Sequence, residues 1–353
     1  MTDDNIHFYV TNNVGLIVLD RPNMLNAISL KMARSIREIM NRWKHKSDLT
    51  HVVISSSSKK AFCAGGDVRY AYLKAQAEDF EATDLFFKTE YLMDLSIVEV
   101  RKPVIALCPG IVMGGGAGIA QHATYTIMTE STKFAMPESS IGLFPDAGAS
   151  LFFGRCPPSV KLLLGITGFI IGAADCFALG LSTATVRDRA IEELKRELID
   201  CAPSEIFEVI RKYQIDVEES LMKVQSQKVD EIFESGLSVE EMQARAKQCL
   251  RQNPDDKLFR FVDMAFSHRC PMSMKVFARL VEESVNFTTP EEALNFDFFL
   301  AKKMTRRSDF LEGVRALLID KDNSPQWSPS KLSEVSDDMI EKVFDKACLS
   351  PLR

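Results

Sequence analysis

The spacing of hydrophobic residues changes near residue 155. Residues 5–20 hold two apolar runs around the turn Asn12-Asn13, which predicts two strands joined by a tight turn. Residues 28–46 place apolar side chains at helical spacing after Ser29, a residue suited to cap a helix. Strand-like and helix-like segments then alternate, and this pattern predicts an α/β core.

Helical spacing prevails beyond residue 156 and is interrupted by polar loops such as "RQNPDD" and "DNSPQWSPS". We therefore expect a core over residues 1–185 and a helical C-terminal region over residues 186–353. Within that region, residues 190–255 are rich in charge. This predicts a peripheral helical segment.

Composition narrows the class of protein. A chain of 353 residues that is 46% hydrophobic can bury a large core. Its net charge of −6 argues against nucleic acid as a partner. No apolar run reaches the ~20 residues of a membrane span, so we expect no membrane segment. The N-terminus resembles neither a signal peptide nor a presequence, which favours the cytoplasm of a bacterium, or a mitochondrial matrix if a presequence is missing.

Cysteine and histidine are scattered along the chain. The 8 cysteines include no C-x-x-C pair, and the 5 histidines do not cluster with them. This predicts reduced, mostly buried thiols and no metal site.

Three consecutive glycines, Gly114, Gly115 and Gly116, follow an apolar run. Each glycine costs roughly 0.5–1 kcal/mol relative to alanine in a regular element, so something must need a bare backbone here. One interpretation is that backbone N–H groups face a ligand. The other is a tight turn with close helix packing. The segment matches neither the phosphate-loop pattern G-x-x-x-x-G-K-[ST] nor the dinucleotide-binding pattern G-x-G-x-x-G.

A second turn of small residues, Ala64-Gly65-Gly66, follows the apolar strand "HVVISSSS". Both turns follow strands that we expect in one sheet. Two such turns can supply two N–H donors that converge on one oxygen, which is the arrangement of an oxyanion hole.

Three carboxylates are candidates for chemistry. Glu138 and Asp146 each come directly after a proline in an otherwise apolar stretch. Desolvation there would raise a carboxyl pKa, which suits a general base. The alternative for Asp146 is a helix N-cap. Glu90, in "FFKTEYLMD", is the third candidate, although most helical glutamates simply face solvent.

Four segments carry a family resemblance: "KAFCAGGD", "GIVMGGGAG", "FAMPESSIGLFPDAG" and "DFLEGVRALLIDKDNSPQW". Together they closely resemble the crotonase (enoyl-CoA hydratase/isomerase) superfamily, over about residues 6–186 and 260–330. The resemblance implies an α/β fold, a crotonase-like spiral of ββα units with a helical C-terminal region. It also implies that residues 260–330 cover the site.

The resemblance further implies an acyl-CoA substrate. The thioester oxygen would accept hydrogen bonds from the N–H groups of Ala64 and Gly115. Coenzyme A is then part of the substrate, no separate cofactor is implied, and a homo-oligomer is compatible with the family. The remaining substrate-binding positions that the resemblance implies are Glu90, Gly65, Gly66, Asp67, Gly114 and Gly116.

The carboxylates distinguish branches of the superfamily. Enoyl-CoA hydratases carry a catalytic Glu where this chain has Gly118, whereas the pattern of the 3-hydroxyisobutyryl-CoA hydrolases is matched by Glu90, Glu138 and Asp146. This implies hydrolysis of 3-hydroxyisobutyryl-CoA to 3-hydroxyisobutyrate and CoA, a step of valine breakdown. Glu138 and Asp146 would be catalytic, with Glu138 acting either as the general base or as the nucleophile. Ala149 and Ser150 depart from the glycine run usual in those hydrolases, so the acyl group is less defined than the reaction. The alternatives are an enoyl-CoA hydratase or isomerase and a non-catalytic CoA-binding homologue.

Overall fold

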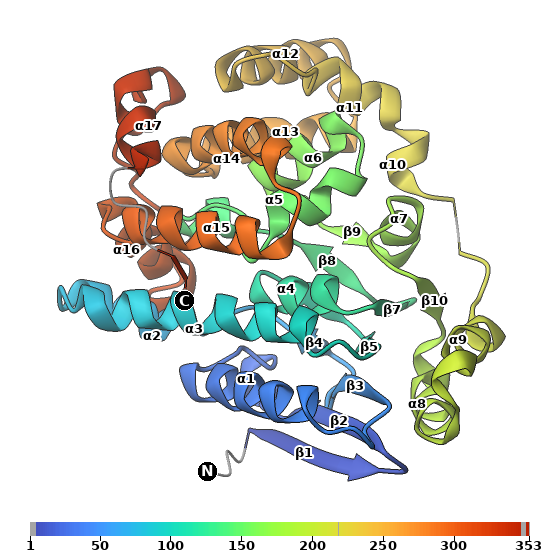
Figure 1. Ribbon diagram of the computed structural model, residues 1–353. Coiled ribbons are helices and arrows are strands. Elements are labelled where there is room, and N and C mark those ends of the chain that lie inside the picture. The colour runs from blue at the N-terminus through green and yellow to red at the C-terminus, as the bar shows by residue number, and fades with distance from the viewer. Residues whose placement is uncertain (1–4, 218, 347–350, 353) are drawn as a thin grey trace. The chain divides into compact units, whose positions relative to one another are not determined.

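We describe the protein from a computed structural model, in which residues 5–217, 219–346 and 351–352 are described (Figure 1). The chain forms two compact units, each assembled from three separate segments. The first unit comprises Met1–Asp67, Lys88–Ala135 and Ile170–Lys223, and the second comprises Val68–Phe87, Met136–Phe169 and Val224–Arg353.

A six-stranded sheet forms the larger part of the first unit. β1 and β2 are antiparallel and joined by Asn12 and Asn13, both in the left-handed conformation that such a turn requires. The remaining neighbours are parallel. In sheet order the strands are β1 (Ile6–Thr11), β2 (Val14–Leu19), β3 (His51–Ser56), β5 (Val104–Cys108), β7 (Tyr125–Thr129) and β10 (Ala184–Val186).

A four-stranded sheet of shorter strands completes the first unit. Its neighbours are parallel except for the last pair, which is antiparallel. The loops after its first two strands carry the glycine-rich turns singled out in the sequence. In sheet order the strands are β4 (Ala61–Cys63), β6 (Ile111–Met113), β8 (Lys133–Ala135) and β9 (Ile171–Gly172).

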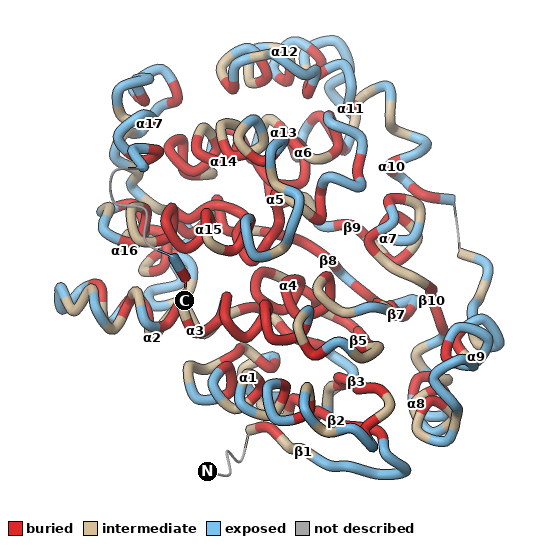
Figure 2. The backbone as a smooth tube through the Cα atoms, in the orientation of Figure 1, coloured by how far each residue is buried: buried red, intermediate tan, exposed pale blue. Residues whose placement is uncertain are grey.

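Helices cover the sheets of the first unit. Ser29 caps α1 as expected, because its side chain accepts a hydrogen bond from the N–H of Met32 at 3.1 Å. α4 is buried over almost its whole length, as Figure 2 shows. The helices are α1 (Leu30–Lys44), the residue 88–99 part of α3 (Phe80–Glu99), α4 (Gly115–His122), α7 (Ala173–Ala178), α8 (Ile191–Asp200), α9 (Ile206–Tyr213) and most of α10 (Leu221–Val224).

The second unit is helical. Its short elements are the π-helical turn η7 (Arg315–Ile319) and the 3-10 turns η2 (Glu138–Ile141), η3 (Phe153–Arg155), η6 (Ser284–Asn286) and η8 (Leu332–Glu334). Its α-helices are α2 (Val68–Gln76), the start of α3, α5 (Ala149–Phe152), α6 (Pro158–Thr167), α11 (Ser226–Ile232), α12 (Val239–Gln252), α13 (Lys257–His268), α14 (Pro271–Glu283), α15 (Pro290–Met304), α16 (Ser308–Val314) and α17 (Asp337–Phe344).

The two units do not follow the boundary expected at residue 185. β10 and the charged helices after it belong to the first unit. Apolar residues of α8 and α9, among them Ile191, Leu194 and Ile206, pack with Val14 and Ile105 into one buried cluster. The beginning of segment 190–255, expected to be peripheral, therefore closes a face of the six-stranded sheet.

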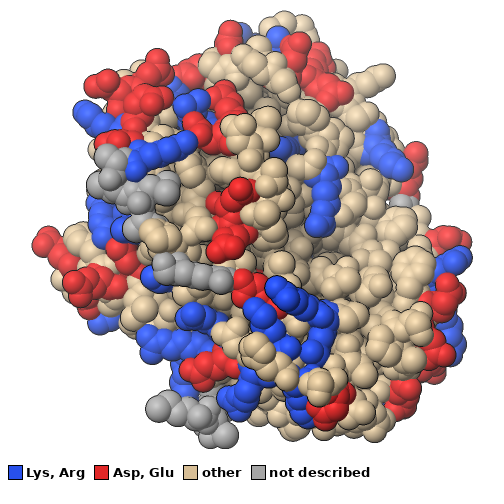
Figure 3. Space-filling view, in the orientation of Figure 1, with Lys and Arg blue, Asp and Glu red and all other residues tan. Residues whose placement is uncertain are grey.

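Charged side chains of both signs are interspersed on the face shown in Figure 3. Among the described helices, none is long and apolar enough to cross a membrane. Seven cysteines are described and none of them forms a disulfide, while the eighth, Cys348, lies outside the described residues.

Candidate functional site

The loop after β4 is held in place by an early segment of the chain, residues 21–28. The N–H of Ala64 donates to the carbonyl of Leu25 at 3.0 Å. The N–H of Ile28 donates to Gly65 at 2.8 Å, and the N–H of Asp67 donates back to Ile28 at 2.9 Å. These three backbone bonds fix the conformation of residues 64–67.

Side chains of the same early segment add to this support. Nη1 of Arg21 contacts Oδ2 of Asp67 at 2.8 Å. The buried amide of Asn26 donates to the carbonyls of Ala61 and Phe62 at 3.2 and 3.1 Å. Asp67 was expected to bind substrate, and here its carboxylate forms an ion pair that orders the loop.

Sequence reasoning and structure differ on the first oxyanion donor. The N–H of Ala64 was the expected donor, but it is already bonded to Leu25. The N–H of Gly66 makes no hydrogen bond to any described residue, and its nitrogen lies 3.4 Å from where a Cβ on Gly115 would stand. Gly66 therefore replaces Ala64 as the candidate donor. No feature of the sequence distinguishes the two, because the difference depends on which amide reaches Leu25.

The triple glycine forms the start of α4. Gly114 has a φ of +52°, and Gly115 is the first helical residue. N–H groups in the first turn of a helix have no partner within the helix, so the N–H of Gly115 is a donor available to a ligand. A Cβ on Gly116 would lie 2.3 Å from the carbonyl oxygen of Cys63. Glycine is therefore required here for two reasons: the backbones pack closely, and a side chain would block access to the N–H donors.

Glu90 lies against this turn. It is buried on α3, and a Cβ on Gly115 would stand 1.7 Å from its Oε1. Asp94, one helical turn further, is fully buried. Asp94 was missed by sequence reasoning, although an acid four residues after Glu90 in an apolar helix is a signal that could have found it.

The buried thiol of Cys63 is close to both acids. Burial, together with the nearby charges of Glu90 and Asp94, raises the pKa of Cys63 to about 12. A thiol with so high a pKa stays protonated near neutral pH, and only the thiolate is a good nucleophile. Cys63 is therefore a packing residue and not a nucleophile.

The other two predicted carboxylates belong to the second unit. Glu138 follows β8 after Met136 and Pro137 and begins η2. Asp146 follows in the next loop, and both side chains are 7% exposed. The structure thus brings Gly66, Gly115 and Glu90 together in the first unit, and places Glu138 and Asp146 in the second.

Asp146 does not cap a helix. The N-cap of α5 is Gly148, and no side chain accepts a capping bond there. The residues after Asp146 are left-handed, with φ of +52° at Ala147 and +82° at Gly148. This turn would be strained without support.

The support comes from Asp297 on α15. Its Oδ2 accepts a hydrogen bond from the N–H of Gly148 at 2.8 Å. Asp297 is fully buried, and burial followed by the nearby charge of Asp146 raises its pKa well above the usual range. Sequence reasoning missed this residue; its only signal is an acid within the apolar run "LNFDFFL".

α16 packs tightly on the turn that begins with Glu138. A Cβ on Gly142 would lie 2.3 Å from the carbonyl oxygen of Asp309, and one on Gly313 would lie 2.5 Å from the carbonyl carbon of Ile141. Within the second unit, part of the segment expected to cover the site therefore does contact the Glu138 turn.

No cluster of described His, Cys, Asp and Glu residues could hold a metal ion.

Comparison with known proteins places this arrangement in a family. Residues 14–344 match the family described as Enoyl-CoA hydratase/isomerase. A relative named 3-hydroxyisobutyryl-CoA hydrolase, mitochondrial, from Danio rerio is 35% identical over 96% of this chain and 88% of its own. The protein of the same name from Homo sapiens is 33% identical over 96% of this chain and 88% of its own.

Two solved structures share the fold. One is a carnitinyl-CoA dehydratase from Mycobacterium thermoresistibile, with a TM-score of 0.88 and 27% identity, covering 97% of this chain and 96% of that one. The other is an enoyl-CoA hydratase from Rhodobacter sphaeroides, with a TM-score of 0.88 and 27% identity, covering 99% and 98%. They confirm the crotonase-like fold predicted from the sequence motifs. The chain belongs to the enoyl-CoA hydratase/isomerase family.

Proposed function

We propose that the protein hydrolyses the CoA thioester of a short 3-hydroxy acid, with 3-hydroxyisobutyryl-CoA as the favoured substrate. Family membership supports an acyl-CoA substrate. The names of relatives at 33–36% identity support the hydrolase. Valine breakdown is the pathway that this substrate implies.

In the proposed reaction the thioester oxygen accepts hydrogen bonds from the N–H groups of Gly66 and Gly115. Negative charge grows on this oxygen as the carbonyl carbon becomes tetrahedral. Fixed donors stabilise that charge without reorganising, and removal of one such donor in another enzyme costs about 10²–10³-fold in kcat.

Glu138 acts as the general base. Its carboxylate takes a proton from water, and the resulting hydroxide attacks the carbonyl carbon. The C–S bond then breaks, CoA leaves as the thiolate and takes up the proton that Glu138 holds, and the acid product is released. Asp146 accepts a hydrogen bond from the 3-hydroxyl of the substrate or holds the attacking water.

One observation carries the choice of hydrolysis over hydration. α4 contains no carboxylate from Gly115 to His122, and Gly118 stands where hydratases have a catalytic Glu. A paired acid and base for addition of water across a double bond is therefore incomplete. The hydratase alternative is supported by the two solved structures of similar fold, one of an enoyl-CoA hydratase and one of a carnitinyl-CoA dehydratase.

A two-substrate assay tests the proposal. The protein is incubated with 3-hydroxyisobutyryl-CoA and, separately, with crotonyl-CoA, while free thiol and enoyl absorbance are followed. Thiol release from the first substrate with no enoyl loss from the second is the expected result. Rapid loss of enoyl absorbance would establish the hydratase instead, and no change in either signal would favour a CoA-binding homologue without activity.

A further inference from the structure

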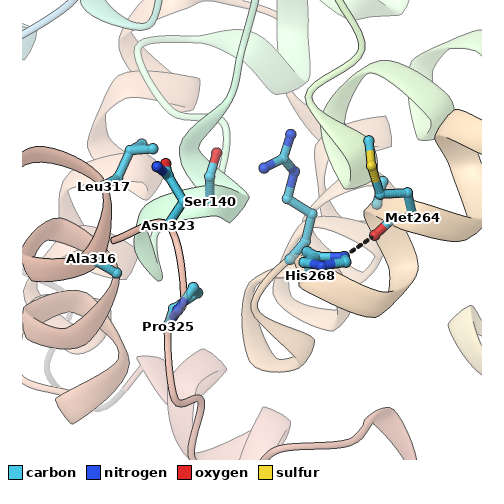
Figure 4. Close-up of a pocket in the computed structure, with 9 residues that line it drawn as sticks. Ser140, Met264, His268, Ala316, Leu317, Asn323 and Pro325 are labelled. Carbon is cyan, nitrogen blue, oxygen red and sulfur yellow. Dashed lines mark hydrogen bonds between the residues drawn. The ribbon is translucent and has the colours of Figure 1, made fainter. Parts of the chain in front are cut away.

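A cavity lies within the second unit, on the same turn as Glu138. It has a volume of about 220 Å³ and is lined by residues of η2, α13, η7 and the loop after η7, and by Arg269 directly after α13. Figure 4 shows Ser140, Leu317 and Asn323 on one side and Met264 and His268 on the other. Ser140 belongs to the 3-10 turn that Glu138 begins, so an occupant would touch that turn.

The guanidinium of Arg269 supplies the positive charge in the wall of this cavity. It is half-buried, and its Nε donates to the carbonyl of the fully buried Thr167 at 3.0 Å. Its two Nη groups make no hydrogen bond or ion pair with any described residue. Burial alone lowers its pKa, with no acid acting in the opposite direction. A partly desolvated guanidinium usually has an anionic partner, because burying an isolated charge is costly.

Two other polar side chains of the cavity keep hydrogen-bonding capacity. Asn323 uses one amide hydrogen on the carbonyl of Lys321 at 3.1 Å and keeps a second. His268 bonds the carbonyl of Met264 through Nδ1 at 2.8 Å, so Nε2 remains for a ligand or solvent. None of the residues that line the cavity is an Asp or Glu. The missing partner of Arg269 is thus not supplied by the cavity wall.

The rest of the wall is apolar. Met264, Ala265, Leu317 and Pro325 contribute it, and no Lys joins Arg269. A planar guanidinium matches the two oxygens of a carboxylate, and its single positive charge neutralises one carboxylate, whereas a phosphate carries a charge of about −1.5 to −2. The volume is below the usual range for drug-sized ligands and far below that of an acyl-CoA.

We propose that this cavity is a binding site for a small aliphatic carboxylate, held by the guanidinium of Arg269 with its hydrocarbon part against Met264 and Leu317. The π-helical turn that forms one side fits such a role, because π-helical turns occur frequently at functional sites. The carboxylate could be the product of the proposed hydrolysis or another cellular acid. The inference itself does not rest on that hydrolysis, because binding is measured without turnover.

Calorimetric titration with isobutyrate and with 3-hydroxyisobutyrate tests the proposal, and inorganic phosphate is a third probe. We expect saturable binding of both acids and much weaker binding of phosphate. Arg269→Met should weaken binding of both acids by about tenfold or more, because it removes a charge-assisted pair. Arg251→Met removes an exposed arginine of the same unit and should leave binding unchanged.

A second variant covers the case in which Arg269→Met unfolds the protein. Met264 is 52% exposed, so Met264→Trp can fill the cavity without disturbing the core, and it should abolish binding with an unchanged Tm. Asp146→Asn distinguishes the catalytic site. Acid binding that is lost in Asp146→Asn but kept in Arg269→Met would overturn the proposal, as would wild-type protein that binds neither acid or binds phosphate more tightly.

Discussion

Asp297 accepts the N–H of Gly148 at 2.8 Å, two residues after Asp146. The bond joins a fully buried acid on α15 to the left-handed turn that carries a proposed catalytic residue. Because the Gly148 N–H needs only an acceptor, a neutral side chain of the same shape can replace Asp297. The two carboxyls also influence each other, since the charge of Asp146 helps to raise the pKa of Asp297.

We predict that Asp297→Asn keeps most hydrolytic activity and that Asp297→Ala loses about tenfold or more in kcat. The Asn side-chain oxygen can still accept from Gly148, whereas Ala leaves that N–H without a partner and the Asp146 turn without support. Steady-state kinetics of the two variants checks this. Equal losses of kcat in both variants would show that the charge, and not the acceptor, is what Asp297 contributes.

The pKa of Asp297 also predicts how stability depends on pH. The unfolded residue titrates near its ordinary value and the folded one well above it, so between these values the folded state binds the extra proton. The Asp297 contribution to the free energy of unfolding is therefore largest at low pH and is lost as pH rises toward the folded pKa.

Asp297→Asn does not titrate, so its stability relative to wild type should increase between about pH 5 and pH 8. Urea unfolding at both values measures the difference. Asp146→Asn is the matched control, because it removes the neighbouring charge and should reduce the slope in part. A difference that stays constant with pH would show that Asp297 ionises normally in the folded protein.

The local structure near the glycine turns was predictable because it depends on neighbours in sequence. Two apolar runs around the turn Asn12-Asn13 predicted β1 and β2, and Ser29 predicted the start of α1. Small residues after two strands predicted the donor loops. The identity of the first donor was not predictable, since the N–H of Ala64 is taken by Leu25, a residue distant in sequence.

The buried acids were harder to find for a related reason. Asp94 and Asp297 lie on helices whose apolar spacing indicates only a core position. Whether an acid in such a helix meets a catalytic loop depends on packing between distant segments, as with Asp297 and Gly148. Arg269 could not be singled out from the sequence for the same reason. Only the folded structure shows that no described Asp or Glu lines its cavity.

Gly115 provides a test of the donor turn. A Cβ there would stand 1.7 Å from Oε1 of Glu90, so Gly115→Ala must displace either the carboxylate or the turn. We expect kcat to fall by about 10²-fold, similar to the loss of one oxyanion donor. Gly154→Ala is the control, because a Cβ at Gly154 meets nothing within 4 Å. Unchanged turnover in Gly115→Ala would remove this turn from the reaction.

Glu138→Gln should abolish hydrolysis and leave binding of the CoA ester nearly intact. The amide keeps the shape of the side chain but cannot take a proton from water, and loss of a general base costs about 10²–10⁴-fold. Turnover and the affinity for a non-hydrolysable CoA thioether are the two measurements. A variant with near wild-type kcat would refute the role assigned to Glu138.

Asp146→Asn tests how the substrate hydroxyl is recognised. If Asp146 accepts a hydrogen bond from the 3-hydroxyl, its loss should strongly lower kcat/KM for the 3-hydroxyacyl thioester and have less effect on the acyl-CoA without the hydroxyl. The Tm should change little, because the N-cap of α5 is Gly148 and Asp146 makes no capping bond there. Equal falls for both substrates would assign Asp146 to the attacking water. A lower Tm with intact turnover would leave it a structural role alone.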